Sequence, residues 1–380
     1  MIRAKLDPHK FIRRIPLAPH QMQDRLTRVE DAIVLCHLGL PRITREDWSL
    51  AIDGLVVRPR TLSFSDLMRY EKVSVTSVHQ CAGSPLAPSE PTQRVCNVSW
   101  AGARLADILA ECGPHPTVRF VWSTGADYGE FAGVGVEAYV KDMPVDRVRS
   151  DVLVAYEMNG EPLEPEHGFP ARLVVPGFYG TNSVKWLTRV TLAEARASGP
   201  FTQRWYNDPV QDECGSASGR TVPVWAIAPQ SVIVAPAPDA TINASKATQI
   251  WGWAWADGGA GQVGISVDGG SWQPALLEPA AERAWQRFTL SWMPEKCGTV
   301  TLASRATAAS GECQPASGRR NAIYRVSVRV IESSQERHSC WRGPQRPNVR
   351  PVHGLQRWDR RETEGWRRCV RGMCRVRPER

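Results

Sequence analysis

Apolar positions along most of the chain come in short runs that favour strands over helices. These runs are rich in β-branched residues and are separated by Gly and Pro turns, a pattern typical of brief strands. They cover residues 118–122, 152–156, 172–175 and 188–192. Because long helical patterns are missing between them, we predict an α+β fold and not a doubly wound sheet.

Helical spacing is confined to short segments. Residues 105–112 have apolar positions at helical intervals and stop at Gly113-Pro114, which is a C-terminal helix signal. Ser63 and Ser65 precede another short helix, predicted to run through Met68 and Tyr70. Residues 1–30 read as an extended polar arm, with a short helix expected around residues 21–28.

A change of texture after Pro200 indicates a second domain. Short alternating strands bounded by turns recur from Thr221, and Trp251, Trp253 and Trp255 alternate on one face. Asp268-Gly269-Gly270 predicts a turn between two strands. We therefore predict an N-terminal arm over 1–30, a catalytic domain over 31–210, an immunoglobulin-like β-sandwich over 221–332 and a tail over 333–380.

The basic charge of the chain is confined to its tail. The formal net charge is +8, and residues 333–380 alone hold 13 Arg and no Lys against 5 Asp and Glu, a balance of +8. The tail has few aliphatic residues and is predicted to be disordered. Because the remainder is neutral, no nucleic-acid partner is expected.

Targeting signals are not evident. Apolar runs fall far short of the ~20 residues that span a bilayer, so no membrane span is predicted. Arg13 and Arg14 form a pair, but no sustained apolar core or small-residue cleavage site follows. We expect a cytoplasmic protein, or a periplasmic one if the N-terminus has been trimmed or a partner carries the export signal.

Two stretches carry residues suited to chemistry. Cys81 lies in Gln80-Cys81-Ala82-Gly83, where the ordinary alternative is a buried thiol in the core. The second stretch contains His, Arg, Ser and Lys around Gly-rich turns, a combination that can hold a polyanion because glycines let the backbone approach a phosphate. A surface hairpin with solvated charges is the alternative. The four residues of this second stretch are His167, Arg172, Ser183 and Lys185.

Together these motifs resemble the sulfite oxidase family of molybdopterin enzymes. The resemblance covers about residues 10–332, and its other pieces include Trp100-Ala-Gly-Ala-Arg-Leu and Ala155-Tyr-Glu-Met-Asn-Gly160. It implies a molybdenum-molybdopterin cofactor (Moco), a sulfite-oxidase-type catalytic domain and a dimerisation domain that makes a homodimer. Cys81 is then the thiolate ligand of the metal, a soft donor suited to a redox-active ion.

The resemblance also assigns roles to other residues. His167, Arg172, Ser183 and Lys185 become contacts of the pterin and its phosphate, and His37 becomes a further cofactor contact. Tyr206, 21 positions after Lys185, matches the active-site tyrosine, whose phenol would hydrogen-bond the reactive oxygen or a bound oxyanion. A tyrosine packed at a domain junction is the alternative.

Departures from the family pattern bear on the substrate. Leu35 occupies an arginine position, and Ser84-Pro85-Leu86 replaces Asn-Arg-Arg after the cysteine motif. Such arginines would pair with an anionic substrate. Arg319 and Arg320 are candidates to reach back to the substrate pocket, with exposed surface arginines as the alternative.

The sequence leaves three alternative functions open. The first is an enzyme that oxidises sulfite or a related sulfur oxyanion by oxygen-atom transfer. The second is a reductase of S-oxides or N-oxides on the same cofactor. The third is a non-catalytic β-sandwich binding protein with a decayed pterin domain. Because the chain has no haem or flavin motif, either enzyme needs an external electron partner such as a cytochrome.

Overall fold

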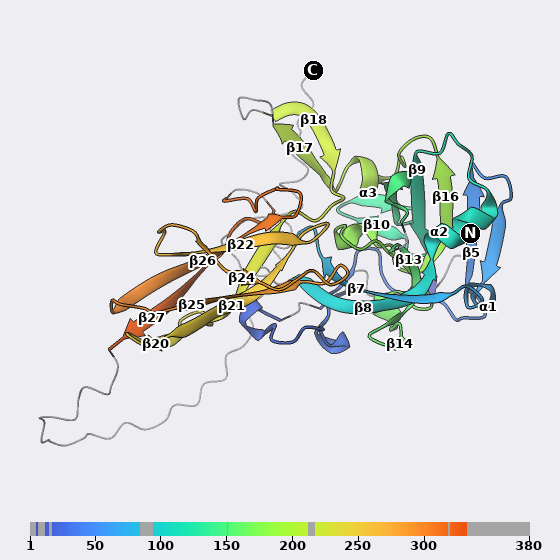
Figure 1. Ribbon diagram of the computed structural model, residues 1–380. Helices are drawn as coiled ribbons and strands as arrows, with labels where there is room; N and C mark the ends of the chain where they lie inside the picture. The colour runs from blue at the N-terminus through green and yellow to red at the C-terminus, as the bar shows by residue number, and fades with distance from the viewer. Residues whose placement is uncertain are drawn as a thin grey trace, which may run out of the picture.

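The computed structural model describes residues 5–6, 12–14, 17–83, 94–149, 151–211, 217–317 and 320–332. Two bodies built mainly of strands lie side by side in Figure 1. The first contains the chain up to α3 (Pro200–Gln203), and the second begins with β19 (Gln230–Ala235). The predicted tail over 333–380 and Ser84-Pro85-Leu86 lie outside the described residues.

The first body contains two main sheets. One has the order β12-β9-β16-β5-β6, in which only β16 and β5 are parallel. Its strands are β12 (Val140–Pro144), β9 (Phe120–Gly125), β16 (Leu187–Ala193), β5 (Ser49–Gly54) and β6 (Arg60–Ser63). The other has the order β14-β13-β8-β7, with β15 on β13. Its strands are β14 (Glu161–Pro162), β13 (Leu153–Met158), β8 (Val95–Arg104), β7 (Lys72–Gln80) and β15 (Arg172–Val174).

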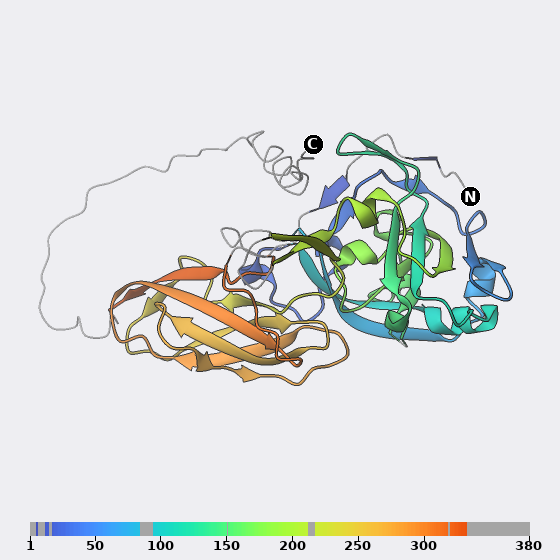
Figure 2. The same cartoon turned by 90° about the horizontal axis from the view of Figure 1, so that it is seen from above.

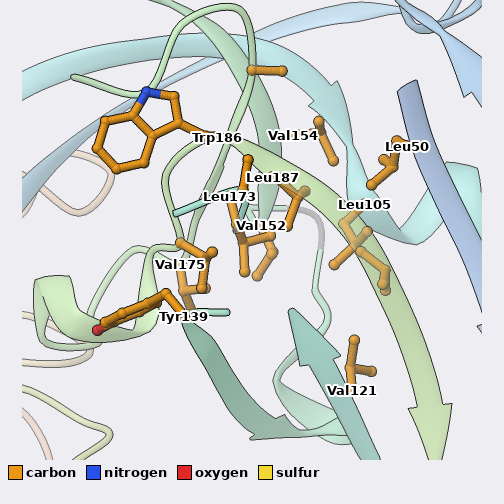
Figure 3. Packing of buried hydrophobic residues seen from close by; sticks show 14 of the residues in the cluster. Leu50, Leu105, Val121, Tyr139, Val152, Val154, Leu173, Val175, Trp186 and Leu187 are labelled. Carbon is orange, nitrogen blue, oxygen red and sulfur yellow. The ribbon is translucent and has the colours of Figure 1, made fainter. Parts of the chain in front are cut away.

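Apolar side chains from both sheets form the core of this body. Leu50, Val121, Leu187 and their neighbours are fully buried, and Figure 3 shows how they pack. The buried Trp48 indole donates a hydrogen bond to the carbonyl of Leu187 at 2.8 Å. Its polar atom is therefore satisfied within the core.

Helices are few and short, as predicted. α2 (Leu105–Cys112) occupies the expected residues and ends at Gly113, whose φ of +65° is a left-handed cap that glycine adopts without strain. α1 (Phe64–Leu67) begins at the Ser63 N-cap, but it ends at Leu67 and does not run through Tyr70 as predicted. No helix within the described part of the chain is long and apolar enough to cross a membrane.

Small two-stranded sheets and short 3-10 turns complete the described chain. The sheets pair β1 (Lys5–Leu6) with β4 (Pro41–Arg42), β2 (Ile12–Arg14) with β3 (Val34–Cys36), β10 (Gly129–Phe131) with β11 (Val134–Val136), and β17 (Asn207–Gln211) with β18 (Ala217–Pro223). The 3-10 turns are η1 (Pro19–Gln21), η2 (Val29–Asp31), η3 (Val145–Arg147), η4 (Pro165–His167) and η5 (Gly180–Asn182).

The prediction of a helix around residues 21–28 is wrong. Only η1 forms there, and the chain continues through bends. Its backbone bonds to other segments instead, because Thr27 N donates to Asn97 O at 2.8 Å and Met22 O accepts from Trp253 Nε1 at 2.7 Å. Tertiary contacts thus override the local helical spacing.

The second body is a β-sandwich of a four-stranded and a five-stranded sheet. The first sheet contains β19, β21 (Thr248–Trp255), β25 (Gln286–Trp292) and β24 (Leu276–Leu277), and the second contains β20 (Thr241–Asn243), β27 (Arg325–Ile331), β26 (Gly298–Ala308), β22 (Ala260–Val267) and β23 (Gln273–Pro274). Ile250 and Phe288 from one sheet pack with Leu302 from the other. Asp268 and Gly269, at φ of +49° and +72°, form the predicted turn.

The two bodies share a buried junction. Val78, Trp253 and Trp285 belong to one apolar cluster that spans both. Arg283 of the second body pairs with Asp151 of the first at 2.8 Å. In Figure 2 β7 and β8 extend from the first body toward this junction. The mostly-strand α+β fold followed by a sandwich is therefore confirmed.

Replacing Phe288 with Ala should destabilise the chain by about 3–5 kcal/mol, because it opens a cavity in the sandwich core. Leu276→Ala on the exposed β24 is the matched control and should cost well under ~1 kcal/mol. Chemical denaturation of both variants measures the difference. Equal losses of stability would contradict this description of the core.

Candidate active site

One cavity in the first body collects all of the predicted site residues. Its volume is about 70 Å³, and it is partly open to solvent. β3, β7, β15 and the loops after them contribute most of its wall. The predicted residues in its lining are His37, Cys81, His167, Arg172, Ser183, Lys185 and Tyr206.

Cys81 follows the last residue of β7 and is half-buried at the cavity wall. Its sulfur accepts a hydrogen bond from Gly83 N at 3.4 Å, and its backbone N donates to Arg94 O at 2.8 Å. Within the described residues no group of three His, Cys, Asp or Glu side chains could hold a metal. A metal on Cys81 would thus need further ligands from a cofactor.

Arg172 links the two loops that make up the predicted polyanion cradle. Its guanidinium is buried and donates to His167 O and Ser183 O, each at 2.9 Å. Burial lowers the pKa of Arg172 to about 10, so the group stays charged near neutral pH. Its carbonyl bonds fix the cradle while its charge makes the cavity wall positive.

Lys185 holds a second part of the wall. Its ammonium donates to Leu35 O and Glu166 O, both at 2.9 Å, and contacts Cys36 Sγ at 3.0 Å. These bonds link the turn after β15 to β3, about 150 residues earlier in the chain. Ser183 Oγ accepts from Val175 N at 3.0 Å in the same region.

His167 offers an unused polar atom. Its ring is 3% exposed, and Nε2 has no hydrogen-bond partner among the described residues. Burial, with the charge of Arg172 second, lowers the pKa of His167 to about 3. A neutral buried imidazole with an open nitrogen can donate to or accept from a polar ligand.

His37 and Tyr206 are hydrogen-bonded neighbours in the cavity wall. Tyr206 Oη and His37 Nε2 are 2.9 Å apart and share a hydrogen bond in which either can donate. Burial, followed by the charge of Lys185, lowers the pKa of His37 to about 3, so the ring is neutral. Tyr206 has a φ of +60°, a left-handed conformation that is strained for a non-glycine residue.

Sequence reasoning missed further polar residues in the lining, among them His79, Asp127 and Tyr139. Burial raises the pKa of Asp127 to about 7, and Tyr139 Oη bonds Thr181 Oγ1 at 2.7 Å. A Cβ on Gly180 would lie 2.8 Å from His79 Nε2, so the His79 ring would have to shift if another residue stood there. Proximity to the Cys81 motif was the only signal for His79, and none was available for the other two.

Arg320 reaches from the second body to the loop of Cys81. Its Nε donates to Ala82 O, and its other nitrogens bind Asp208 at 2.5 and 3.0 Å. Asp208 raises the pKa of Arg320 against the effect of burial. Arg320 is therefore not a solvated surface residue, whereas Arg319 lies outside the described residues.

Comparison with known families agrees with this arrangement. Residues 37–201 match the model of the oxidoreductase molybdopterin binding domain. Residues 222–330 match the model of the Mo-co oxidoreductase dimerisation domain. The cavity falls mainly within the first match, and Arg320 lies within the second.

Individual relatives are similar over most of the chain. Sulfite oxidase of Gallus gallus is 32% identical over 73% of this chain and 66% of its own length. Mitochondrial sulfite oxidase of Drosophila melanogaster is 30% identical over 78% of this chain and 58% of its own length. The chain thus spans less than two thirds of these relatives.

A solved structure gives the same picture. The sulfane dehydrogenase of Paracoccus pantotrophus superposes with a TM-score of 0.69 at 30% identity. The likeness covers 82% of each chain, so it includes both bodies.

Replacing Arg172 with Lys should lower stability by roughly 1–3 kcal/mol, because buried carbonyls lose their donors. Arg58→Lys is the matched control, since Arg58 also bonds a carbonyl, that of Glu111, but is exposed. Thermal unfolding of the two variants measures the difference. A loss for Arg58→Lys as large as that for Arg172→Lys would contradict the clamp role.

Proposed function

The chain belongs to the sulfite oxidase family of molybdopterin oxidoreductases, and on that premise we propose that it oxidises sulfite or a related sulfur oxyanion by oxygen-atom transfer. The resemblance expected from the sequence motifs is confirmed. So are the predictions of a molybdopterin cofactor and of a dimerisation domain. Sulfur compounds are named as substrates of the sulfite oxidases and the sulfane dehydrogenase, which supports the proposal.

The single observation that carries the proposal is that one cavity joins Cys81 to the polyanion cradle. Cys81 presents a sulfur at the wall, and His167 Nε2 in the same lining is buried and has no hydrogen-bond partner among the residues that the structure describes. Lys185 and Arg172 make the surroundings positive. A thiolate ligand, an open imidazole nitrogen and buried cations suit a metal bound through a phosphate-bearing pterin.

In this assignment Cys81 would ligate molybdenum, while His37, His167, Arg172, Ser183 and Lys185 would hold the pterin and its phosphate. When bound, the cofactor supplies two-electron oxygen-atom chemistry. Arg172 fixes the two cradle loops relative to each other through its hydrogen bonds to the carbonyls of His167 and Ser183. Lys185 fixes β3 through its hydrogen bond to the carbonyl of Leu35.

Tyr206 is the group that we expect to act on the substrate. Its hydroxyl reaches His37 Nε2 at 2.9 Å at the cavity wall, so the phenol can donate to a bound oxyanion while His37 orients it. His37 is neutral because its pKa is about 3, and it therefore adds no competing charge. Preorganised donors of this kind favour charge that develops during reaction.

We propose two kinds of partner, an electron acceptor and a second copy of the chain. Its sequence has no haem or flavin motif, so we propose that electrons leave to an external acceptor such as a cytochrome. We also propose a homodimer formed through the second body, on the strength of the dimerisation-domain match.

Reduction of S-oxides or N-oxides is a second candidate. It is favoured because Arg172 is the only arginine among the described residues that line the cavity. Leu35 lines the cavity at a position where the family pattern has arginine. The guanidinium of Arg172 donates its hydrogen bonds to backbone carbonyls. A less charged substrate would need fewer cations.

Sulfite oxidation with a soluble one-electron acceptor should be detected with the purified cofactor-loaded chain. Tyr206→Phe should lower kcat by about 100-fold at unchanged molybdenum content, because one oriented donor is lost. Dimethyl sulfoxide and trimethylamine N-oxide, supplied with a reduced electron donor, test the second candidate. Turnover of these oxides without sulfite oxidation would overturn the first proposal.

A further inference from the structure

Lys141 is a buried ammonium that lies behind Tyr206, outside the cavity lining. It sits on β12 with an exposure of 1%. Its Nζ lies 5.2 Å from the centroid of the Tyr206 ring and donates to Phe201 O at 2.9 Å. A cation at this distance from an aromatic face is attracted by the ring quadrupole.

No carboxylate within the described part of the chain forms an ion pair with Lys141. The adjacent Asp142 is bound instead by Arg196, at 2.9 and 3.0 Å. Burial lowers the pKa of Lys141 to about 7, while Asp142 raises it and Arg196 lowers it. A buried ammonium without a counter-ion destabilises the fold, so its position beside Tyr206 calls for a function.

The hydrogen bond from Lys141 Nζ to the Phe201 carbonyl reaches the turn that precedes Tyr206. Phe201 lies in α3, and Trp205 N closes that turn onto Pro200 O at 2.9 Å. Tyr206 follows in its left-handed conformation, and its carbonyl accepts from Val224 N at 2.9 Å. Lys141 is therefore bonded to the turn that Tyr206 directly follows.

We propose that Lys141 is a positioning residue for Tyr206. It anchors the α3 turn through Phe201 O and sets a positive charge on the ring face, which makes the Tyr206 hydroxyl a stronger hydrogen-bond donor toward the substrate. The proposal rests on the proposed function, since it concerns the same site. A nearby positive charge favours loss of the phenol proton, and a more acidic donor forms stronger bonds.

Two substitutions separate the charge from the anchor. Lys141→Gln keeps an amide donor for Phe201 O and removes the charge, whereas Lys141→Met removes both. If Lys141 only filled space, Lys141→Gln would have the same effect with or without the Tyr206 hydroxyl. Exposed Lys72, paired with Glu157, gives the control Lys72→Gln.

Turnover of the cofactor-loaded chain is the first readout. Lys141→Gln should lower kcat about tenfold with little change in KM, and by less than about twofold when Tyr206 is already Phe. Lys72→Gln should change neither. Equal losses in both backgrounds would overturn the proposal. So would an unchanged kcat in Lys141→Gln while Tyr206→Phe is impaired, which leaves the proposed function intact.

The pH dependence gives a second readout that a purely structural role would not move. Lys141 is charged below its pKa of about 7 and neutral above it. Therefore kcat should fall as pH rises through about 7 in the parent, and Lys141→Gln should lack this step. Asp142, Arg196 and Tyr206 are the titratable or charged groups that face Lys141.

A third readout does not require any substrate. In the full chain with labelled tyrosine, the ring carbon signals of Tyr206, identified by their loss in Tyr206→Phe, should shift as pH crosses about 7. The shift should vanish in Lys141→Gln. No shift in the parent, or an equal shift in the variant, would overturn the proposal whether or not sulfite is oxidised. Failure of sulfite turnover with the shift present would count against the proposed function alone.

Discussion

The buried amide of Gln80 is the contact on which the position of Cys81 depends. Its Nε2 donates to Gln230 Oε1 at 3.0 Å and to Asn321 Oδ1 at 2.8 Å, and its Oε1 accepts from Trp255 Nε1 at 2.9 Å. All three partners belong to the second body. Since unsatisfied buried amides are costly, the residue before Cys81 is locked to the sandwich. The sandwich thus helps to build the site.

The cavity combines fixed cations with neutral imidazoles. Lys185 and Arg172 direct their hydrogen bonds to backbone carbonyls, so they contribute charge and rigidity more than direct bonds to a ligand. His37 and His167 are kept neutral by burial, each with a pKa of about 3. Neutral donors beside fixed positive charge suit a polyanionic cofactor and a small oxyanion while limiting the number of buried charges.

Local patterns were sufficient for the parts of the fold that depend on neighbours in sequence. α2 and its Gly113 cap, the strands and the Asp268 turn follow from residue spacing. Residues 21–28 did not form a helix because their bonding partners lie in distant segments. The Cys81 motif and the cradle could be picked out as motifs, whereas Asp127 and Lys141 could not. Their roles depend on burial against residues that only the folded chain brings near.

Molybdenum analysis by mass spectrometry, on the parent and on Cys81→Ser from the same cofactor-producing host, tests the central claim most directly. The account predicts about one molybdenum per parent chain, since a single thiolate site accepts one metal, and loss of oxygen-atom-transfer activity in the variant. Absence of molybdenum from the parent would contradict the assignment of the cavity. The binding-protein reading would then be favoured.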